Sequence, residues 1–436
     1  MAIIPQVTLF EYSELEELGD LERFKLALEG IDDEELMRKL EKRRKNGRDD
    51  FPVRVMWNLL IAMIICEYKL VSSFLRELNR NSQLRRVCGL FDRAGRKNLT
   101  PPPRVFTGFF KTLIEFQDDV EQIFDTQVIN LYGLLPGFGE TTAGDGKYID
   151  SVANRKPKDE STKEKAGNRR DNNAEWSTKE YHYKDTDGKK KVKKEYHFGF
   201  KAHIICDVNY ELPIVHSVTP ANADEKKEML KLLQSPVLSS EEHKKVAKHL
   251  LLDRGYDSGK MIKGIKAAGM IPVVDIRNCW KDGEETKQYK NTDMVYNAYG
   301  EVSHYDYVEK YDKETETTKR EYLPVKMKYE GYDKQKNCLR YSHKGKTKQI
   351  SISYDERIFL PIARDSDKFK RIYKGRTAVE RLNGRLDRDY MFEKHYIRGL
   401  DKMRLMVSLS LIVMNGMAIG KIKNNIDSIR SLKKAS

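Results

Sequence analysis

Hydrophobic residues recur at helical spacing through the first third of the chain. Leucines alternate with charged residues from 14 to 45, and apolar positions three and four residues apart continue to about residue 135. The two most apolar stretches, 55–66 and 405–419, are too short to span a membrane, so we expect both to be buried helices. The pattern predicts an all-α region over residues 1–135.

The pattern changes to short strands after residue 140. Residues 155–195 are strongly polar, and their second half predicts a hairpin that turns at Asp187 and Gly188. Two further strands are predicted within residues 198–221. Leu250–Leu252 is a short apolar run followed by glycines, which is typical of a strand buried on both faces. Strands that alternate with helices in this way predict an α/β fold.

A tyrosine-rich segment interrupts this fold between residues 279 and 357. It holds 11 of the 23 tyrosines and several runs in which apolar and polar residues alternate. This alternation predicts a β-rich insertion. Helical spacing returns at about residue 366 and continues almost to a basic tail.

Composition limits the kinds of partner and site. The chain has a net charge of +14, which favours a polyanion, either a nucleic acid or a membrane surface. Its five cysteines include no C-x-x-C pair and its nine histidines lack ligand spacing, so we expect no zinc site and a reducing compartment. No basic and apolar leader is apparent, and we expect a cytoplasmic protein. Any metal must then be held by carboxylates.

Two aspartates are candidates for such a site. Asp253 follows the strand Leu250–Leu252, and chemistry collects at the carboxyl ends of strands in open α/β sheets. Asp145 stands between Gly144 and Gly146, which let a ligand come close. A turn aspartate is the alternative interpretation of Asp145, because Asp beside Gly is common in turns.

The third candidate acid is Glu380. If residues 373–387 form a helix, then Tyr373, Arg376, Glu380 and Asp387 share one polar stripe. An ordinary solvated stripe with an Arg–Glu pair is the alternative. Gly384 costs about 1 kcal/mol in a helix interior, which suggests the close approach of a ligand or of a packed neighbour. Two aspartates and a glutamate could hold Mg²⁺ ions, and two such ions can drive phosphoryl transfer.

Four blocks of sequence resemble, in order, the DDE transposases of bacterial insertion sequences. They read GDGKYIDSVANR, FGFKAHIICDVNYELPIVHSVTPANADEKK, LLDRGYDS and YKGRTAVERLNGRL. Tyr373, Arg376 and Glu380 match the signature Y-x2-R-x3-E-x6-K of one subgroup, but its lysine position holds Asp387. With upstream helices that also look alike, the resemblance covers roughly residues 50–420.

The resemblance implies a ribonuclease H-like core, whose sheet is mixed and flanked by helices, and a reaction. Asp145, Asp253 and Glu380 would be the catalytic acids and would bind Mg²⁺, with Mn²⁺ as a substitute. The enzyme would cut double-stranded DNA at the terminal inverted repeats of its element and join the freed 3′-hydroxyl ends to target DNA. A homodimer assembled on DNA, with no membrane partner, would be expected in the bacterial cytoplasm at the nucleoid.

Several residues near these acids are candidate DNA contacts. Arg385 or Arg388 could replace the missing signature lysine. Lys201 and His203 alternate along one strand face, for which a solvated face is the alternative. For Trp176, docking on the core is favoured slightly over stacking on a base. The predicted DNA-binding set is Tyr373, Arg376, Arg385, Arg388, Arg254, Lys147, Lys201, His203 and Trp176.

These expectations give a domain organisation and leave two functional alternatives. Asp387 also fits a domesticated, non-catalytic DNA-binding relative, and a metal-dependent nuclease without strand transfer is the other alternative. The predicted parts are a DNA-binding and dimerisation region (1–135), the first part of the core (136–278, with a polar insert at 155–195), the insertion (279–357), the second part of the core (358–420) and a basic tail (421–436).

Overall fold

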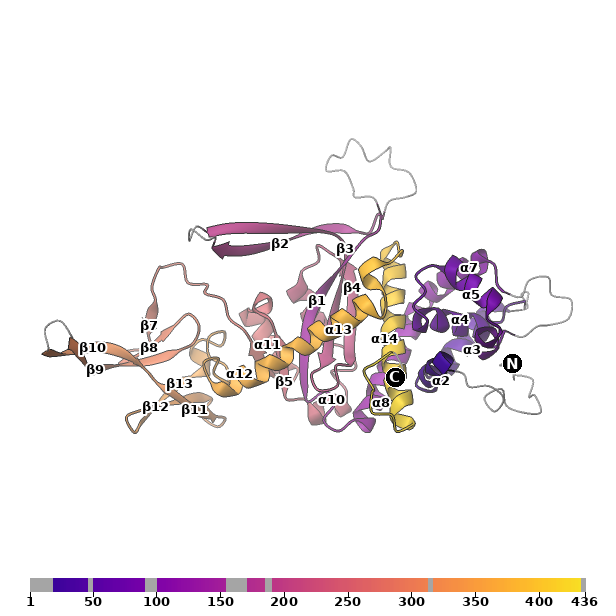
Figure 1. The fold of residues 1–436 in the computed structure, drawn as a ribbon. Helices are drawn as coiled ribbons and strands as arrows, with labels where there is room; N and C mark the ends of the chain where they lie inside the picture. Colours follow the sequence, from indigo (N-terminus) through magenta and orange to yellow (C-terminus); the bar gives the residue numbers. More distant parts are fainter. Residues whose placement is uncertain are drawn as a thin grey trace.

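The computed structural model describes residues 19–45, 50–90, 100–153, 171–184, 190–312 and 317–432. Figure 1 shows the N-terminal helices on one side, a central sheet with flanking helices, and a β-rich insertion on the far side of that sheet. The sheet and its helices carry the three candidate acids, so they are the part that positions the site.

The N-terminal region is helical, as predicted. Its apolar faces are buried, and Trp57 and Phe74 have no exposed surface. No side chain caps α5 by a hydrogen bond, whereas Asn81 caps α6 by accepting from the N–H of Leu84. The elements are η1 (Gly19–Leu21), α2 (Glu22–Glu29), α3 (Glu34–Arg44), α4 (Val53–Ile65), α5 (Val71–Arg80), α6 (Ser82–Val87), α7 (Pro103–Glu115) and α8 (Gln117–Leu134).

Helix α14 (Leu400–Lys423) joins these helices to the sheet, because it packs against α2, α8 and β4 (Figure 1). The approach to α2 is close: a Cβ atom on Gly420 would lie 1.9 Å from the carbonyl oxygen of Leu26. By length and composition α14 could cross a membrane, but 89% of its apolar window is buried inside the protein. The prediction of a buried helix is confirmed.

The central sheet has the strand order β2-β3-β1-β5-β6, and β4 pairs with β3. Strand β1 runs antiparallel to β3 and parallel to β5, which is parallel to β6. Together with helices on both faces and the insertion, this mixed sheet confirms the predicted ribonuclease H-like fold class. The strands are β1 (Thr141–Asp150), β2 (Glu175–Lys184), β3 (Lys190–Asp207), β4 (Pro213–Pro220), β5 (His249–Leu252) and β6 (Ile271–Val274).

Strand β3 is longer than predicted. The predicted hairpin exists, because β2 pairs with the first half of β3, while the turn expected at Asp187 and Gly188 lies outside the described residues. A separate strand was expected to begin near residue 198. Instead β3 continues without a break for 18 residues into the sheet, where its second half pairs with β1 and β4.

Helices cover both faces of this sheet. A Cβ atom on Gly144 would meet Met229 of α9, whereas Lys147 reaches Asp387 of α13. Successive residues of a strand point to opposite faces, so Asp145 shares the face that α13 covers. The remaining helices of the core are α9 (Glu225–Leu232), α10 (Glu241–Val246), η3 (Arg254–Tyr256), α11 (Gly259–Ala267), α12 (Asp367–Tyr373), η5 (Lys374–Arg376), α13 (Thr377–Arg388) and η6 (Phe392–Lys394).

The insertion is β-rich, as predicted, and forms two small sheets. Strands β10-β9-β8-β7 form one and β11-β12-β13 the other. Its apolar residues, Tyr341 and Phe359 among them, make a hydrophobic cluster of their own. The elements are β7 (Thr286–Gln288), β8 (Met294–Asn297), β9 (Val302–Asp312), β10 (Thr317–Lys326), β11 (Lys328–Asp333), β12 (Cys338–His343), β13 (Lys346–Ser351) and η4 (Ile352–Tyr354).

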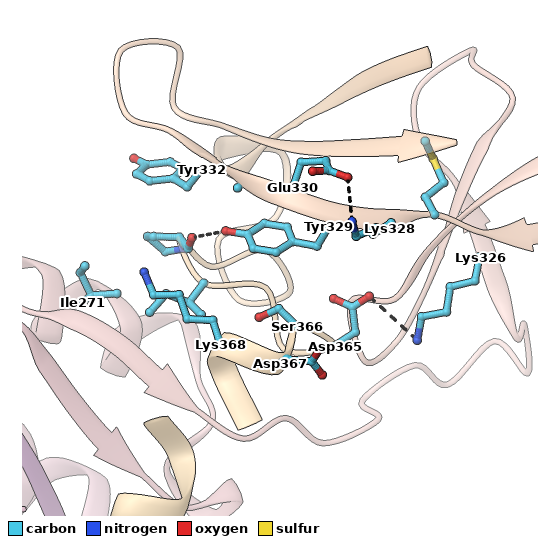
Figure 2. Close-up of a pocket in the computed structure, with 14 residues that line it drawn as sticks. Ile271, Lys326, Lys328, Tyr329, Glu330, Tyr332, Asp365, Ser366, Asp367 and Lys368 are labelled. Atoms are coloured by element: carbon cyan, nitrogen blue, oxygen red, sulfur yellow. Dashed lines mark hydrogen bonds and ion pairs between the residues drawn. The ribbon is translucent and has the colours of Figure 1, made fainter. Parts of the chain in front are cut away.

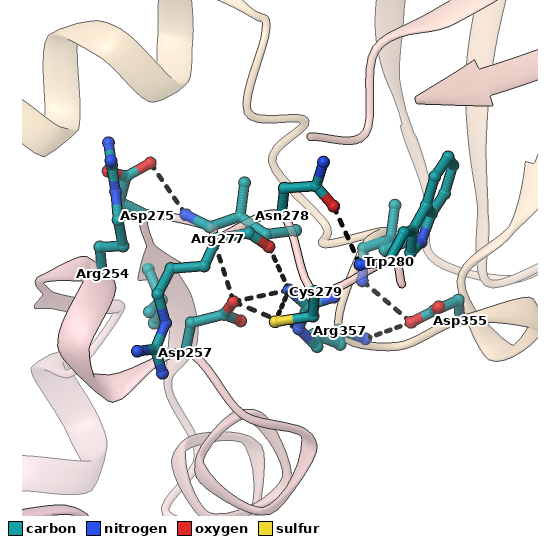
Figure 3. Close-up of polar contacts among 12 residues, drawn as sticks. Arg254, Asp257, Asp275, Arg277, Asn278, Cys279, Trp280, Asp355 and Arg357 are labelled. Carbon is teal, nitrogen blue, oxygen red and sulfur yellow. Dashed lines mark hydrogen bonds and ion pairs between the residues drawn. The ribbon is translucent and has the colours of Figure 1, made fainter. Parts of the chain in front are cut away.

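A polar cluster joins the insertion to the core (Figure 3). Arg357 donates to Oδ2 of Asp257 at 2.9 Å, and the N–H of Arg277 donates to the same oxygen at 3.0 Å. The Asp257 side chain has no exposed surface. Asp257 does not cap the helix that follows it, since Ser258 caps α11 by accepting from the N–H of Met261.

Candidate active site

Asp145 and Asp253 lie on neighbouring strands. The parallel pairing of β1 and β5 matches Ala143 with Leu251, and each aspartate stands two residues farther along its own strand. Residues two apart share a face of a sheet, so the two carboxyl groups point the same way. Burial chiefly, and the charge of Asp253 in addition, raise the pKa of Asp145 to about 6, against the opposing charge of Arg376.

Local turns orient both carboxylates. The N–H of Gly146 donates to Oδ1 of Asp145 at 2.8 Å, and the N–H of Gly255 donates to Oδ1 of Asp253 at 2.7 Å. Asp253 thereby caps η3. A Cβ atom on Gly255 would lie 2.8 Å from that Asp253 oxygen, so a larger residue there would displace the carboxylate.

Glu380 lies on α13, whose apolar side is buried against the core. Val379, Leu382 and Leu386 have no exposed surface, which confirms the predicted apolar face. Glu380 is half-exposed and forms an ion pair with Arg376, one turn earlier.

The segment 373–387, considered as one helix in the sequence, is divided in the structure. It forms α12, a 3₁₀ turn at η5 and then α13. Gly375 explains the break, because a Cβ atom there would lie 2.7 Å from Val208 and 3.3 Å from Leu251. No packed neighbour approaches Gly384, since a Cβ atom there would have no neighbour within 4 Å, and the approach of a ligand at this position stays a prediction.

Two of the three acids, Asp145 and Asp253, are placed to bind a divalent cation, whereas Glu380 is held by Arg376. Asp145 and Asp253 offer the oxygen ligands that Mg²⁺ prefers, and a cation between them would relieve the cost of burying Asp145 as an anion. Within the part of the chain that the structure describes, no three His, Cys, Asp or Glu side chains stand close enough to hold one ion. Glu380 would have to leave Arg376 to complete the set.

A second ion pair links the strand of Asp145 to the helix of Glu380. Nζ of Lys147 lies 2.6 Å from Oδ2 of Asp387. The Lys147 side chain is 11% exposed and that of Asp387 is 35% exposed. The residue that replaces the signature lysine is therefore paired with a lysine supplied by β1.

The comparisons with known proteins decide the family. A family model described as "Transposase DDE domain" matches residues 161–415, which is more than half of the chain. The chain belongs to the DDE transposase family. Asp253 and Glu380 fall inside the matched range and Asp145 precedes it. DDE transposases are phosphoryl-transfer enzymes that act on DNA and generally use divalent metal ions.

Other comparisons add little for this transposase. No curated protein matches the chain. Among solved structures, the chain is similar to the piggyBac transposase in a synaptic complex with hairpin DNA, with 12% identity and a TM-score of 0.38. That similarity covers 95% of this chain and 78% of the other, and it is too distant to bear on the site.

Four of the predicted DNA contacts lie on the chain segments that carry Asp253 and Glu380. Arg254 is exposed and pairs with Asp275 at 2.8 Å, and Arg388 is exposed and pairs with its neighbour Asp389. Tyr373 stacks on Phe369, and burial chiefly raises its pKa to about 12. Arg376 bonds Glu380, as described above.

Three other predicted DNA contacts are buried in the DNA-free protein, where each is held by partners inside the fold. Arg385 donates to the backbone carbonyl groups of Arg430 and Glu211. Nζ of Lys201 lies 2.7 Å from Glu225, with only 3% of the lysine side chain exposed.

His203 is the third of these residues. It is fully buried against Thr219, and burial lowers its pKa to about 4. Trp176 packs on Phe198, 5.2 Å between ring centroids, so the preference for docking on the core is confirmed.

Sequence reasoning missed two residues beside the aspartates. Glu225 and Asp253 both raise the pKa of Asp145, so Glu225 is a third carboxylate near it. The hydroxyl of Tyr256 is buried among these three acids and has no hydrogen-bond partner among the described residues. No local pattern marks Glu225, because Glu225 begins helix α9 and its partner Lys201 lies on strand β3.

A hollow of about 870 Å³ lies between the insertion and α12 (Figure 2). Lysines and acids alternate around it, and Lys326 faces Asp365 across one side. Its lining includes none of the candidate acids of the transposase. We therefore assign the chemistry to the edge of the sheet and not to this hollow.

Proposed function

We propose that this transposase binds the terminal inverted repeats of an insertion sequence, cleaves DNA strands there with two Mg²⁺ ions, and transfers the freed 3′-hydroxyl ends to target DNA. The observation that carries the proposal is the pairing of β1 with β5, which brings Asp145 and Asp253 together on the face covered by the Glu380 helix. Paired carboxylates beside a basic surface suit a phosphate diester.

Each residue has a role in this proposal. Asp145, Asp253 and Glu380 hold the ions, which when bound activate the attacking oxygen and stabilise the leaving oxygen. Arg376 neutralises Glu380 in the free protein and turns to a DNA phosphate when Glu380 is engaged. Tyr373, stacked on Phe369, holds the start of this segment in place beside the aspartates.

The proposed partner is duplex DNA bound by a homodimer in the bacterial cytoplasm. The net charge of +14 supports a polyanionic partner. Cutting two ends of one element and joining them to one target requires two active sites, and a symmetric dimer provides them.

The test is cleavage and joining by the purified protein with Mg²⁺ and a duplex that carries the terminal repeats of its own element. We expect nicked product first and joined product later. Glu380→Gln should abolish both while DNA binding survives. Glu241→Gln is the matched control, because Glu241 is an exposed helix residue paired with Lys244 on α10. Undiminished cleavage by Glu380→Gln would reject the assigned acids.

Two other results would replace the proposal. Binding to the repeats without cleavage, in Mg²⁺ and in Mn²⁺, would indicate a non-catalytic relative, for which Asp387 is the motivating residue. Nicked product that is never joined would indicate a nuclease without strand transfer.

A further inference from the structure

We propose that Lys147 and Asp387 form a latch: Lys147 is a DNA-phosphate contact beside Asp145, and Asp387 holds that lysine until a phosphate takes its place. The latch deepens the proposed function and rests on it for the location of the DNA. It identifies Lys147 as the basic side chain that contacts DNA at the site, and it gives Asp387 a role.

The position of the pair is the first argument. Lys147 follows Asp145 by two residues on β1, so the two side chains share a face of the sheet. Asp387 follows Glu380 by seven residues on α13, which is two helical turns and therefore the same side of that helix. A phosphate held near the acids would thus lie near the Lys147 ammonium.

The energetics of burial are the second argument. A charged lysine side chain that is only 11% exposed is stable where an anion compensates it. Asp387 supplies that anion at 2.6 Å, and its own side chain is 35% exposed. Asp387 can therefore turn to water without leaving a buried charge, whereas Lys147 needs another anion. A DNA phosphate supplies one.

The other basic residues near the acids are less suited to this contact. Lys201 is 3% exposed and lies against Glu225 on the face that α9 covers, and Arg385 bonds backbone carbonyl groups in the interior. Arg376 already serves Glu380. Lys147 shares the face of Asp145 and is paired with an acid outside the proposed catalytic set.

The pair also accounts for the altered signature. Position 387 carries an acid in this chain, and the lysine that contacts this acid comes from β1 instead of α13. Asp387 is then a compensated exchange and not a sign of a damaged copy.

The first experiment measures DNA binding in EDTA over a range of salt concentrations. Lys147→Met, which keeps the packing of the aliphatic stem, should weaken binding about tenfold and reduce the slope of log Kd against log salt by about one. Asp387→Asn should tighten binding several-fold, because the phosphate no longer displaces a carboxylate. Lys147→Arg should retain most of the affinity.

The second experiment measures strand cleavage at saturating DNA with Mg²⁺. Lys147→Met should cleave roughly 100-fold more slowly, at the lower end of the range found when one charge-stabilising donor is removed. The exchanged double variant Lys147→Asp with Asp387→Lys should cleave at least tenfold faster than Lys147→Asp alone. That rescue is not expected from two independent structural effects.

Lys248→Ala is the matched control. Lys248 is a strand-associated lysine that pairs with Glu140 at 2.8 Å, just before β5 and β1 begin. This pair lies at the opposite ends of the same two strands, so its loss should leave binding and cleavage unchanged. Thermal unfolding of each variant separates failed folding from lost contact.

The latch would be overturned by a purely structural outcome. In that outcome Lys147→Met and Asp387→Asn lower the unfolding temperature by similar amounts. Both variants then show the same slope of log Kd against log salt as the parent protein. The binding experiment decides this even if the parent protein proves unable to cleave, or if Glu380→Gln cleaves normally. Failure of the proposed function and failure of the latch are therefore distinguishable.

Discussion

The core and the insertion are held together in different ways. In the core, one hydrophobic cluster extends from the N-terminal helices through the central sheet to α14. The insertion has a smaller cluster of its own, with several tyrosines in it. The contacts of Figure 3 between the two are polar, through Asp257, Arg277 and Arg357.

This difference teaches that the two parts depend on different forces. Helix α13 is fixed to the sheet by buried aliphatic side chains, so the Glu380 backbone cannot move far from Asp145. The insertion is oriented by a few charged hydrogen bonds. Such bonds stabilise only while their geometry is good and every partner is present. We expect single polar substitutions to loosen the insertion and leave the site in place.

Removal of Arg357 should have the largest effect. Arg357→Ala leaves the Asp257 carboxylate buried without its cation, which costs about 3–5 kcal/mol when a buried pair is broken. Hydrogen exchange should speed up across residues 280–356 and remain slow in β1 and β5. Equal acceleration in both parts would show that they unfold as one unit.

A substitution at Gly420 should disrupt the core instead. In Gly420→Val the new Cβ atom would lie 1.9 Å from the Leu26 carbonyl oxygen, so α2 must move away from α14 at a cost of about 3 kcal/mol. Urea denaturation measures the loss. Gly384→Ala is the control, because a Cβ atom there meets nothing within 4 Å, and it should raise stability by about 1 kcal/mol.

Asp145→Asn should stabilise the metal-free protein at neutral pH. The pKa of Asp145 rises from 3.8 to about 6 on folding, so folding favours the protonated form. Ionisation in the folded state costs stability, which is lost as pH rises from about 4 to about 6. The variant should gain about 3 kcal/mol at pH 7.5 and almost nothing at pH 4.

Urea unfolding of parent and variant at the two pH values measures this difference. Mg²⁺ should stabilise the parent at pH 7.5 and the variant much less, because ligand binding to the folded state adds to stability. A stability difference that does not change with pH would contradict the burial of an ionised Asp145.

The smallest effect should come from the exposed tyrosines of the insertion. Tyr307 is 65% exposed and lies against Tyr322 across the β9–β10 pair. Tyr307→Ser should cost less than about 1 kcal/mol. The matched change at the fully buried Tyr341 should cost several times as much. Similar losses at both sites would mean that the exposed face is covered by a partner.

Short-range sequence patterns predicted many of the strands and helices of the core. Leu250–Leu252 and the turn after it were enough to place Asp253 at the end of a strand, because burial on both faces and a glycine turn are short-range signals. The apolar positions of α13 and the buried α14 followed from helical periodicity. The acids themselves stood out once strand ends and helix faces were assigned.

The partners of charged residues could not be predicted in the same way. Lys201 and Arg385 look like surface residues in the sequence, yet their partners lie 24 and 174 residues away, at Glu225 and Glu211. Their burial depends on how distant elements pack. The same reason hid the break at Gly375, where Val208 in the turn after β3 and Leu251 of β5 approach closely.

The uninterrupted course of β3 restricts how this chain can vary in length. Its 18 residues extend roughly 60 Å at about 3.3 Å per residue, and three partner strands share it. Deleting one residue near its middle would invert every side chain on the hairpin side relative to the sheet. Related sequences that differ in length here should therefore do so at the tip of the hairpin, or by two residues at a time.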